Sequence, residues 1–394
     1  MTAPDFDRII DRRGTRCSKW DDMQAAYGVS PEDGLAMWVA DMDFAPPAAV
    51  QEAVQAAVSH GVYGYPGANA PYLQAIRWWM AARHDWQIDT DWITTCAGLV
   101  NGVAMALDAY TRPGDGVIVM SPVYHAFARV IRAADRDLVE LPLALQDDQY
   151  RMDWSAWEGM LKGHERLLIL CSPHNPGGRV WSPEDLAEVA GFCRRHDLIL
   201  VSDDIHCDLV MPGAPRHRMV ATVVPDIADR LVTLTSATKT FNIAGAHLGN
   251  AIIADPDLRA RFRHALAARG VSVGMLGMDM VAAAYSPEGA AWVDALMTYL
   301  DGNRRIFDAG VNAIPGLRSM PLQATYLSWV DFSGTGMTQA DFTARVEGPA
   351  RIAANHGPTF GTGGADFLRF NIATPRARIT EAVARLQSAF ADLQ

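Results

Sequence analysis

The 394-residue sequence has few cysteines and no long apolar run. Its five cysteines are an odd number, and no two form a CxxC pair. This argues against a disulfide framework or a structural zinc site and favours a reducing cytoplasm. Because no run of about 18 apolar residues occurs, we expect no membrane span. Residues 1–11 carry acids and no apolar segment, so we expect no secretory signal there.

Basic residues are also fewer than acidic residues. Asp and Glu number 45 against 34 for Lys and Arg, which gives a net charge of −11. This balance argues against a nucleic acid or an anionic membrane as partner, but it leaves room for a local basic pocket. Hydrophobic residues make up 49% and charged residues 20%, which is typical of a globular protein. The length allows two or three domains, or one large α/β unit.

Short apolar runs alternate with amphipathic stretches in the middle of the chain. We expect buried strands at residues 117–120, 167–170, 198–201, 231–234 and 251–253. We expect helices at about 98–110 and from Ser182, an N-cap followed by Pro, to about 196. This alternation predicts an α/β layer around a parallel sheet that is covered on both faces.

The C-terminal part of the chain has a different pattern. We expect a long helix at 286–309, strands at 325–330 and 367–371, and a closing helix at 379–393. The chain is therefore expected to have three parts: an N-terminal arm or part of the small domain at 1–48, a large α/β domain at 49–285 and a smaller α+β domain at 286–394.

A single lysine follows the predicted strand 231–234. Lys239 lies among small and apolar residues in the segment 235–245 (TSATKTFNIAG). It is either an ordinary lysine at the mouth of a loop or a lysine used chemically, since desolvation lowers a lysine pKa and favours imine formation.

Polar residues also follow two neighbouring strands. Asp203, Asp204 and His206 come after the strand 198–201, and Asn175 lies in a Pro/Gly-rich turn after the strand 167–170. Ligands of open α/β sheets bind outside the carboxyl ends of strands, so these residues suggest a site. Helix capping and a solvated acid are the alternative interpretation.

Small residues open the helix that follows residue 98. The segment 96–102 (CAGLVNG) would offer free backbone N–H groups to a phosphate, although such a start is weak evidence alone. Cys171 and Cys207 flank the candidate site in sequence, and we interpret both as small buried fillers and not as nucleophiles.

Taken in order, these motifs resemble fold type I pyridoxal 5′-phosphate (PLP) enzymes of the aminotransferase class I/II superfamily, over almost the whole chain. The sequence is most similar to the cystathionine β-lyase-like C–S lyases of the MalY/PatB type. The resemblance is carried by the motifs 37–44 (MWVADMDF), 122–124 (PVY), 172–176 (SPHNP), 202–208 (SDDIHCD) and 238–245 (TKTFNIAG). It implies a large PLP-binding domain, with a mostly parallel seven-stranded sheet between helices, and a smaller α+β domain.

The resemblance also assigns roles around the cofactor ring. Lys239 would bind PLP covalently and then act as base toward the Cα proton. Asp203 would pair with the pyridine nitrogen and keep the ring an electron sink. Asn175 and His206 would hydrogen-bond the ring O3′. Tyr124 would stack on the ring, with a core aromatic as the alternative; it completes the expected catalytic set with Lys239 and Asp203.

Further roles concern the phosphate. Gly98 and Leu99 would bind it through backbone N–H groups and Ser236 through its hydroxyl. Tyr65 would reach the phosphate of a neighbouring subunit, which implies a homodimer with shared active sites. Many aminotransferases have Arg and these lyases Gln at the position of His247, which could still donate to the phosphate.

On the substrate side, Arg369 would clamp the α-carboxylate of an amino acid, with Trp38 and Ala40 beside it. A solvated arginine at a strand end is the alternative for Arg369. Besides His247, further positions depart from the family pattern: Asp204 stands where Glu is usual, and His125 stands where many relatives have Tyr or Pro. His206 itself stands where many relatives carry Tyr.

Three functions compete at this stage. The first is a β-lyase that cleaves cystathionine or a related cysteine S-conjugate to a thiol, pyruvate and ammonia. The second is an aminotransferase with the same lysine, aspartate and arginine, and the third is a non-catalytic protein that binds a regulator. A metal enzyme fits poorly because His174, His206 and His217 lack ligand spacing on one helix. A nucleotide-binding loop fits poorly because the segment 98–102 lacks the Walker pattern.

Overall fold

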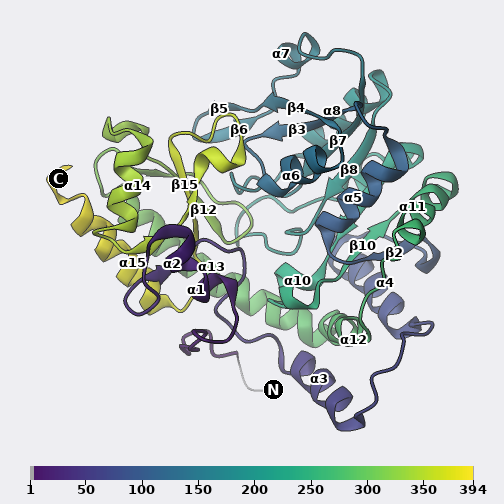
Figure 1. The fold of residues 1–394 in the computed structure, drawn as a ribbon, viewed down its shortest axis with the longest axis horizontal. Helices are drawn as coiled ribbons and strands as arrows, with labels where there is room; N and C mark the ends of the chain where they lie inside the picture. The colour runs from purple at the N-terminus through teal and green to yellow at the C-terminus, as the bar shows by residue number, and fades with distance from the viewer. Residues whose placement is uncertain (1–3, 394) are drawn as a thin grey trace.

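The computed structural model describes residues 4–393, and its largest sheet has seven strands in the order β2-β10-β9-β8-β7-β3-β4 (Figure 1). The strands are β2 (Ile93–Cys96), β3 (Gly116–Ser121), β4 (Asp137–Pro142), β7 (Glu165–Cys171), β8 (Ile199–Asp203), β9 (Leu231–Thr235) and β10 (Gly249–Ile252). Neighbours from β9 to β4 pair in parallel, whereas β10 is antiparallel to both of its neighbours. The mostly parallel seven-stranded sheet is therefore confirmed.

Successive residues of these strands pack into different hydrophobic clusters on the two faces of the sheet. Val117 and Val119 of β3 belong to one cluster, and Ile118 and Met120 belong to another. The first cluster includes residues of α5 (Leu99–Tyr110), α6 (His125–Ala133) and α11 (Pro256–Ala268), and the second includes residues of α8 (Pro183–Arg195). Both faces are thus covered, which explains the continuously apolar strand sequences.

A second, smaller sheet of four antiparallel strands belongs to the C-terminal part of the chain. Its order is β11-β12-β15-β14, with β11 (Arg318–Ser319), β12 (Leu327–Asp331), β14 (Asn355–His356) and β15 (Phe367–Asn371). The long helix α13 (Pro287–Asn312) leads into it, and α14 (Gln339–Glu347) and α15 (Arg376–Ala389) pack beside it (Figure 1).

The N-terminal segment joins this smaller part of the fold. Its strand β1 (Leu35–Ala36) pairs in parallel with β13 (Ile352–Ala353). The other elements are α1 (Ser18–Asp21), α2 (Met23–Tyr27), α3 (Ala48–His60), α4 (Ala70–His84), β5 (Ala144–Gln146), β6 (Gln149–Arg151), α7 (Trp154–Glu158), α9 (Val220–Val223), α10 (Ala237–Thr240) and α12 (Met275–Ala284). Within residues 4–393, no helix combines the length and the apolar composition needed to cross a membrane.

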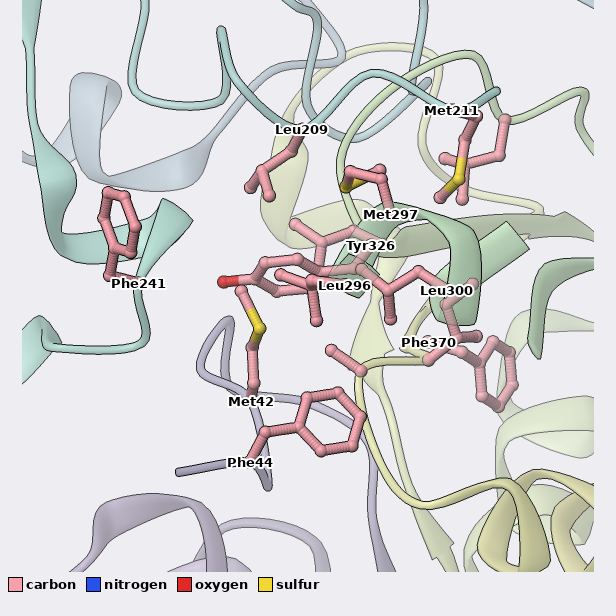
Figure 2. Packing of buried hydrophobic residues seen from close by; sticks show 14 of the residues in the cluster. Met42, Phe44, Leu209, Met211, Phe241, Leu296, Met297, Leu300, Tyr326 and Phe370 are labelled. Atoms are coloured by element: carbon pink, nitrogen blue, oxygen red, sulfur yellow. The ribbon is translucent and has the colours of Figure 1, made fainter. Parts of the chain in front are cut away.

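One buried hydrophobic cluster connects the N-terminal segment with α13 and the smaller sheet. Figure 2 shows Tyr326 in this cluster, with Met42 and Phe44 on one side and Leu296 and Leu300 of α13 nearby. Burial of these side chains holds the segment that contains Met42 against the body of the protein. This segment passes the carboxyl ends of the central strands.

Candidate active site

A cavity of about 520 Å³ lies where the loops after β7, β8 and β9 meet the N-terminus of α5, the N-terminal segment and the smaller sheet. It brings together eleven residues to which the resemblance assigned a role toward the cofactor or the substrate: Trp38, Ala40, Gly98, Leu99, Tyr124, Asn175, Asp203, His206, Lys239, His247 and Arg369. These residues come from segments far apart in sequence, so the cavity exists only in the folded chain.

Lys239 lies in α10, the short helix that follows β9. Its Nζ donates a hydrogen bond to the carbonyl oxygen of Ala40 at 2.5 Å. Burial lowers the pKa of Lys239 to about 8, against the opposing effect of the Asp41 and Asp203 carboxylates. The neutral amine, which is the state that a nucleophile or a base requires, is therefore far more populated at neutral pH than in an ordinary lysine with a pKa of 10.5.

Asp203 ends strand β8 and is 5% exposed. Burial, with a smaller contribution from the neighbouring Asp204 carboxylate, raises the pKa of its carboxyl to about 7. The backbone N–H of Ile205 donates to Oδ1 at 3.1 Å and opposes this shift, as does the charge of Lys239. A cation placed in the cavity beside Asp203 would hold the carboxylate ionised.

Two further polar side chains face the same cavity. His206 is buried, and its Nδ1 has no hydrogen-bond partner among the described residues. Burial lowers the pKa of His206 to about 3, so the ring is neutral and can donate from one nitrogen. Asn175 uses Oδ1 to accept a hydrogen bond from Arg369, which leaves its amide NH₂ as the donor toward a ligand.

Tyr124 stands at the N-cap of α6 and lines the cavity. Its ring contacts His125 and Phe127 edge to face, at centroid distances of 4.9 and 5.6 Å. Burial raises the pKa of the Tyr124 hydroxyl, so this group stays protonated near neutral pH. The ring is therefore held by its neighbours while it remains part of the cavity wall.

Arg369 lies in β15 and is 2% exposed. Its guanidinium donates to Asn175 Oδ1 at 3.0 Å, to Asn355 Oδ1 at 2.6 Å and to the carbonyl of Trp38 at 3.0 Å. All three acceptors are neutral, and Nε has no partner within the described part of the chain. Burial lowers the pKa of Arg369 to about 10, so it remains charged at neutral pH. A ligand carboxylate would supply the missing negative charge.

The N-terminus of α5 forms another wall. Gly98 is its N-cap with φ +85°, a conformation that favours glycine, and a Cβ at this position would enter open space. The N–H groups of the first turn have no acceptors within the helix and favour an anion. His247 and Thr238 also line the cavity, and the sequence had not singled out Thr238.

Two predicted phosphate ligands lie outside the cavity lining. Ser236 caps α10, and its hydroxyl donates to the carbonyl of Leu248 at 2.6 Å. Tyr65 is 100% exposed on the segment between α3 and α4. Their contact with phosphate remains a prediction.

Two other cavity residues were given no role from the sequence. Tyr27 and Asn355 come from opposite ends of the chain, and Asn355 Nδ2 donates to the Tyr27 hydroxyl at 3.1 Å. His125 and Cys171, named above as a departure from the family pattern and as a buried filler, also line the cavity. Cys171 is buried, and burial raises the pKa of its thiol, which fits the interpretation of an unreactive filler.

Behind this site, His84, Cys207 and Asp208 each place one potential metal ligand atom within 4.8 Å of the others. Asp208 accepts hydrogen bonds from His84 at 2.8 Å, Trp79 at 2.9 Å and Thr240 at 2.8 Å. These donors occupy the carboxylate, so the cluster is a hydrogen-bonded network. Through Thr240 it supports the helix that carries Lys239.

Comparison with known proteins agrees with this arrangement. The family model "Aminotransferase class I and II" matches residues 35–386. The sequence is 36% identical over 387 residues to cystathionine beta-lyase PatB of Bacillus subtilis, covering 98% of this chain and 99% of that protein. It is 32% identical over 390 residues to protein MalY of Escherichia coli, covering 98% of each. The structure of cystalysin from Treponema denticola, which contains a pyridoxal 5′-phosphate cofactor, aligns with a TM-score of 0.94 at 35% identity and covers 100% of both chains.

Proposed function

The chain belongs to the aminotransferase class I and II family, and we propose that it is a PLP-dependent C–S β-lyase. The substrate is cystathionine or a related cysteine S-conjugate. With cystathionine, one water is consumed and homocysteine, pyruvate and ammonia are formed. The observation that carries this proposal is the convergence of Lys239, Asp203 and Arg369 on one cavity, in a chain 36% identical to a cystathionine beta-lyase along almost its full length.

The residues of the cavity fit PLP. Asp203 offers a buried carboxylate for a ring cation, and His206 offers a buried ring nitrogen with no partner in the described part of the chain. Gly98 leaves open space at the start of α5, where an anion such as a phosphate is favoured. Lys239 offers an amine whose pKa is lowered to about 8. Each functional group of the cofactor therefore has a matching partner.

When bound, PLP supplies an electron sink for the electron pair released at Cα of an amino acid. Lys239 would hold the cofactor covalently, and its amine, once free, would take the Cα proton. Asp203 would keep a proton on the ring nitrogen. Arg369 would bind the α-carboxylate and so fix which bond to Cα faces Lys239. The ammonium of Lys239 formed in this way would carry a proton that the sulfur leaving Cβ can accept.

The substrate side of the cavity is bounded by aromatic and polar groups. Trp38 and Tyr27 pack edge to face at a centroid distance of 5.0 Å, and both line the cavity together with His125 and Thr359. We propose that this region receives the group attached to the substrate sulfur. A mixed apolar and polar lining suits the chain of a cysteine S-conjugate.

An aminotransferase would use the same lysine, aspartate and arginine, so the assay must separate the two reactions. We expect purified protein loaded with PLP to form pyruvate and homocysteine from L-cystathionine with no 2-oxo acid added. Lys239→Ala should abolish the reaction. Absence of pyruvate, together with turnover that depends on a 2-oxo acid, would instead identify an aminotransferase.

We further propose a cytoplasmic homodimer. The five cysteines are free, which suits a reducing compartment. Tyr65 is fully exposed, and Val62 and Tyr63 beside it are 66% and 62% exposed. An apolar segment of this kind suits contact with a second copy, whose phosphate site Tyr65 would complete.

A further inference from the structure

Asn355 lies between Arg369 and Tyr27 and fixes the direction of the hydrogen bonds that join them. Strands β14 and β15 pair antiparallel with Asn355 opposite Arg369, and the guanidinium donates to Asn355 Oδ1 at 2.6 Å. A guanidinium has only donors, so the oxygen of the amide must face it. The NH₂ group of Asn355 is therefore left for Tyr27, and Nδ2 donates to the Tyr27 hydroxyl at 3.1 Å.

The hydroxyl of Tyr27 keeps its own proton for another partner. Its oxygen accepts from Asn355, and no residue within 4–393 accepts its proton. Burial raises the pKa of this hydroxyl to about 12, so it remains protonated at neutral pH. The ring makes edge-to-face contacts with Trp38 and His356, at centroid distances of 5.0 and 5.3 Å. Tyr27 therefore presents an unused hydrogen-bond donor on a well-packed ring at the wall of the cavity.

Most other donors on the substrate side of the cavity are already used. The Trp38 indole N–H and the Thr359 hydroxyl both donate to main-chain carbonyls, at 2.8 and 2.6 Å. His125 is the remaining polar side chain, and burial lowers its pKa to about 4, so its ring is neutral and carries one N–H. A ligand group that enters this region therefore meets the Tyr27 hydroxyl as one of two unused donors.

Asn355 also separates the Tyr27 hydroxyl from the position expected for the substrate α-carboxylate. That carboxylate is expected against Arg369, and the amide of Asn355 hydrogen-bonds to the guanidinium on one side and to the hydroxyl on the other. The Tyr27 ring instead contacts Trp38, in the region that we assign to the group on the substrate sulfur. A matching acceptor would therefore belong to that group.

We propose that Tyr27 is a specificity-determining residue, whose hydroxyl donates a hydrogen bond to an oxygen atom in the substituent on the substrate sulfur. The inference rests on the proposed function and narrows its substrate class to cysteine S-conjugates whose substituent carries an oxygen acceptor, such as the distal carboxylate of cystathionine. An alkyl substituent of the same shape would cover the hydroxyl without offering an acceptor, which costs binding free energy.

The test compares two substrates of nearly the same shape. S-(2-carboxyethyl)-L-cysteine carries an oxygen acceptor, and S-(3-methylbutyl)-L-cysteine has methyl groups in place of the carboxylate oxygens. Steady-state kcat/KM for pyruvate formation is measured with protein loaded with PLP, and L-cystathionine is the third substrate. We expect Tyr27→Phe to lower kcat/KM about tenfold for the carboxyethyl substrate and for cystathionine, and to leave it unchanged for the methylbutyl substrate.

A matched control makes the same substitution at a tyrosine outside the cavity. The hydroxyl of Tyr110 donates to the carbonyl of Leu258 at 2.8 Å. Tyr110→Phe removes this buried hydroxyl and should keep the wild-type ratio of the carboxyethyl and methylbutyl kcat/KM values. The ratio therefore reports on substrate preference and not on a general loss of stability.

The outcomes separate this inference from the proposed function. Unchanged kcat/KM values for all three substrates in Tyr27→Phe overturn the inference and leave the proposed function intact. An equal fall for all three also overturns it, because Tyr27 would then act on a part that the substrates share, or through Asn355 on Arg369. The same change of ratio in Tyr110→Phe overturns it as well. Wild-type protein that forms pyruvate from none of the substrates overturns both proposals.

Discussion

Arg369 donates a hydrogen bond to Oδ1 of Asn175 across 3.0 Å, and so joins the expected carboxylate-binding residue to an expected ligand of the cofactor ring. The two residues come from β15 of the smaller sheet and from the turn after β7 of the central sheet. With these roles, substrate recognition and cofactor electronics would share one contact. A substrate carboxylate that draws Arg369 toward itself would also change what Asn175 donates to the ring.

The first prediction concerns this arginine. Arg369→Lys keeps a charge but loses the paired donors, so we expect kcat/KM for cystathionine to fall about 100-fold, mostly through KM. Steady-state kinetics with cystathionine check this. Arg136→Lys, which alters a partly buried arginine bonded to Thr111, is the control and should behave as wild type. An unchanged KM in Arg369→Lys would remove the proposed carboxylate contact.

The second prediction concerns covalent attachment of PLP to Lys239. Attachment needs the neutral amine, and burial lowers the pKa of Lys239 to about 8. The neutral fraction therefore rises as pH rises through about 8, and the attachment rate of apoprotein with PLP should rise over the same range. Stopped-flow absorbance measures this rate. A midpoint near 10.5, the ordinary lysine value, would contradict the burial argument.

Borohydride reduction followed by peptide mass spectrometry identifies the attachment site. The chain contains three lysines, Lys19, Lys162 and Lys239, so the assignment is unambiguous. Lys162→Arg should label as wild type does, whereas Lys239→Arg should not label. Label on Lys162 in the wild type would show that the attachment is adventitious.

The third prediction addresses the shared site. Tyr65 is fully exposed in one chain, and we expect its hydroxyl to reach the phosphate of a second copy. Tyr65→Phe should weaken PLP binding about tenfold, as expected for the loss of one hydrogen bond to a charged group. Tyr63→Phe, on the same segment, is the matched control. Equal PLP affinities in both variants and the wild type would count against the shared site.

The fourth prediction concerns a buried ion cluster under the N-terminal segment. The carboxylate of Asp43 lies 2.9 Å from Arg12, 3.1 Å from Lys19 and 3.3 Å from Arg378. Lys19 is 0% exposed, so Asp43→Asn would leave buried positive charge poorly compensated. We expect this variant to lose about 3–5 kcal/mol of unfolding free energy, measured by urea denaturation. Asp11→Asn, at an exposed ion pair, should leave the urea midpoint unchanged.

The same cluster has a defined pH dependence. The neighbouring cations hold the pKa of Asp43 at about 2, below its ordinary value of 3.8, although burial acts in the opposite direction. A depressed carboxyl pKa contributes stability that is present above 3.8 and is lost as pH falls through about 2. The wild type should lose this contribution in that window, and Asp43→Asn should not. Identical acid-unfolding curves for the two proteins would refute the assignment.

Most of the fold was predictable because the central strands have a clear sequence signal. The five predicted strands of the central sheet all occur, since each is buried on both faces and reads as a continuous apolar run. The two strands that were not predicted lie at the edges. β4 (DLVELP) is only partly buried and carries charge, and β2 (ITTC) is short and rich in threonine. Edge strands need less apolar surface, so their sequences give a weaker signal.

The residues of the candidate site also differ in how far the sequence could place them. Residues that directly follow predicted strands, such as Asp203 and Asn175, could be placed at the sheet edge from sequence because topology fixes that edge. Tyr27 and Asn355 could not, because tertiary packing alone brings them into the cavity. Ser236 was the hydroxyl predicted to face the cofactor, but Thr238, two residues later, lines the cavity instead. Which of the two hydroxyls faces the cavity depends on the geometry of the short helix α10.

The acceptor that holds the amine of Lys239 is a main-chain oxygen, that of Ala40, which also accepts from the Tyr326 hydroxyl. A substitution at position 40 leaves this main-chain oxygen in place. Substitutions there would therefore test only the size and shape of the side chain. The position of the Ala40 carbonyl, which accepts from Lys239 Nζ, instead depends on a side chain elsewhere in the chain. The amide nitrogen of Asn371 donates to the carbonyls of Val39 and Asp41, on either side of Ala40. A substitution of Asn371 would therefore displace the Ala40 carbonyl.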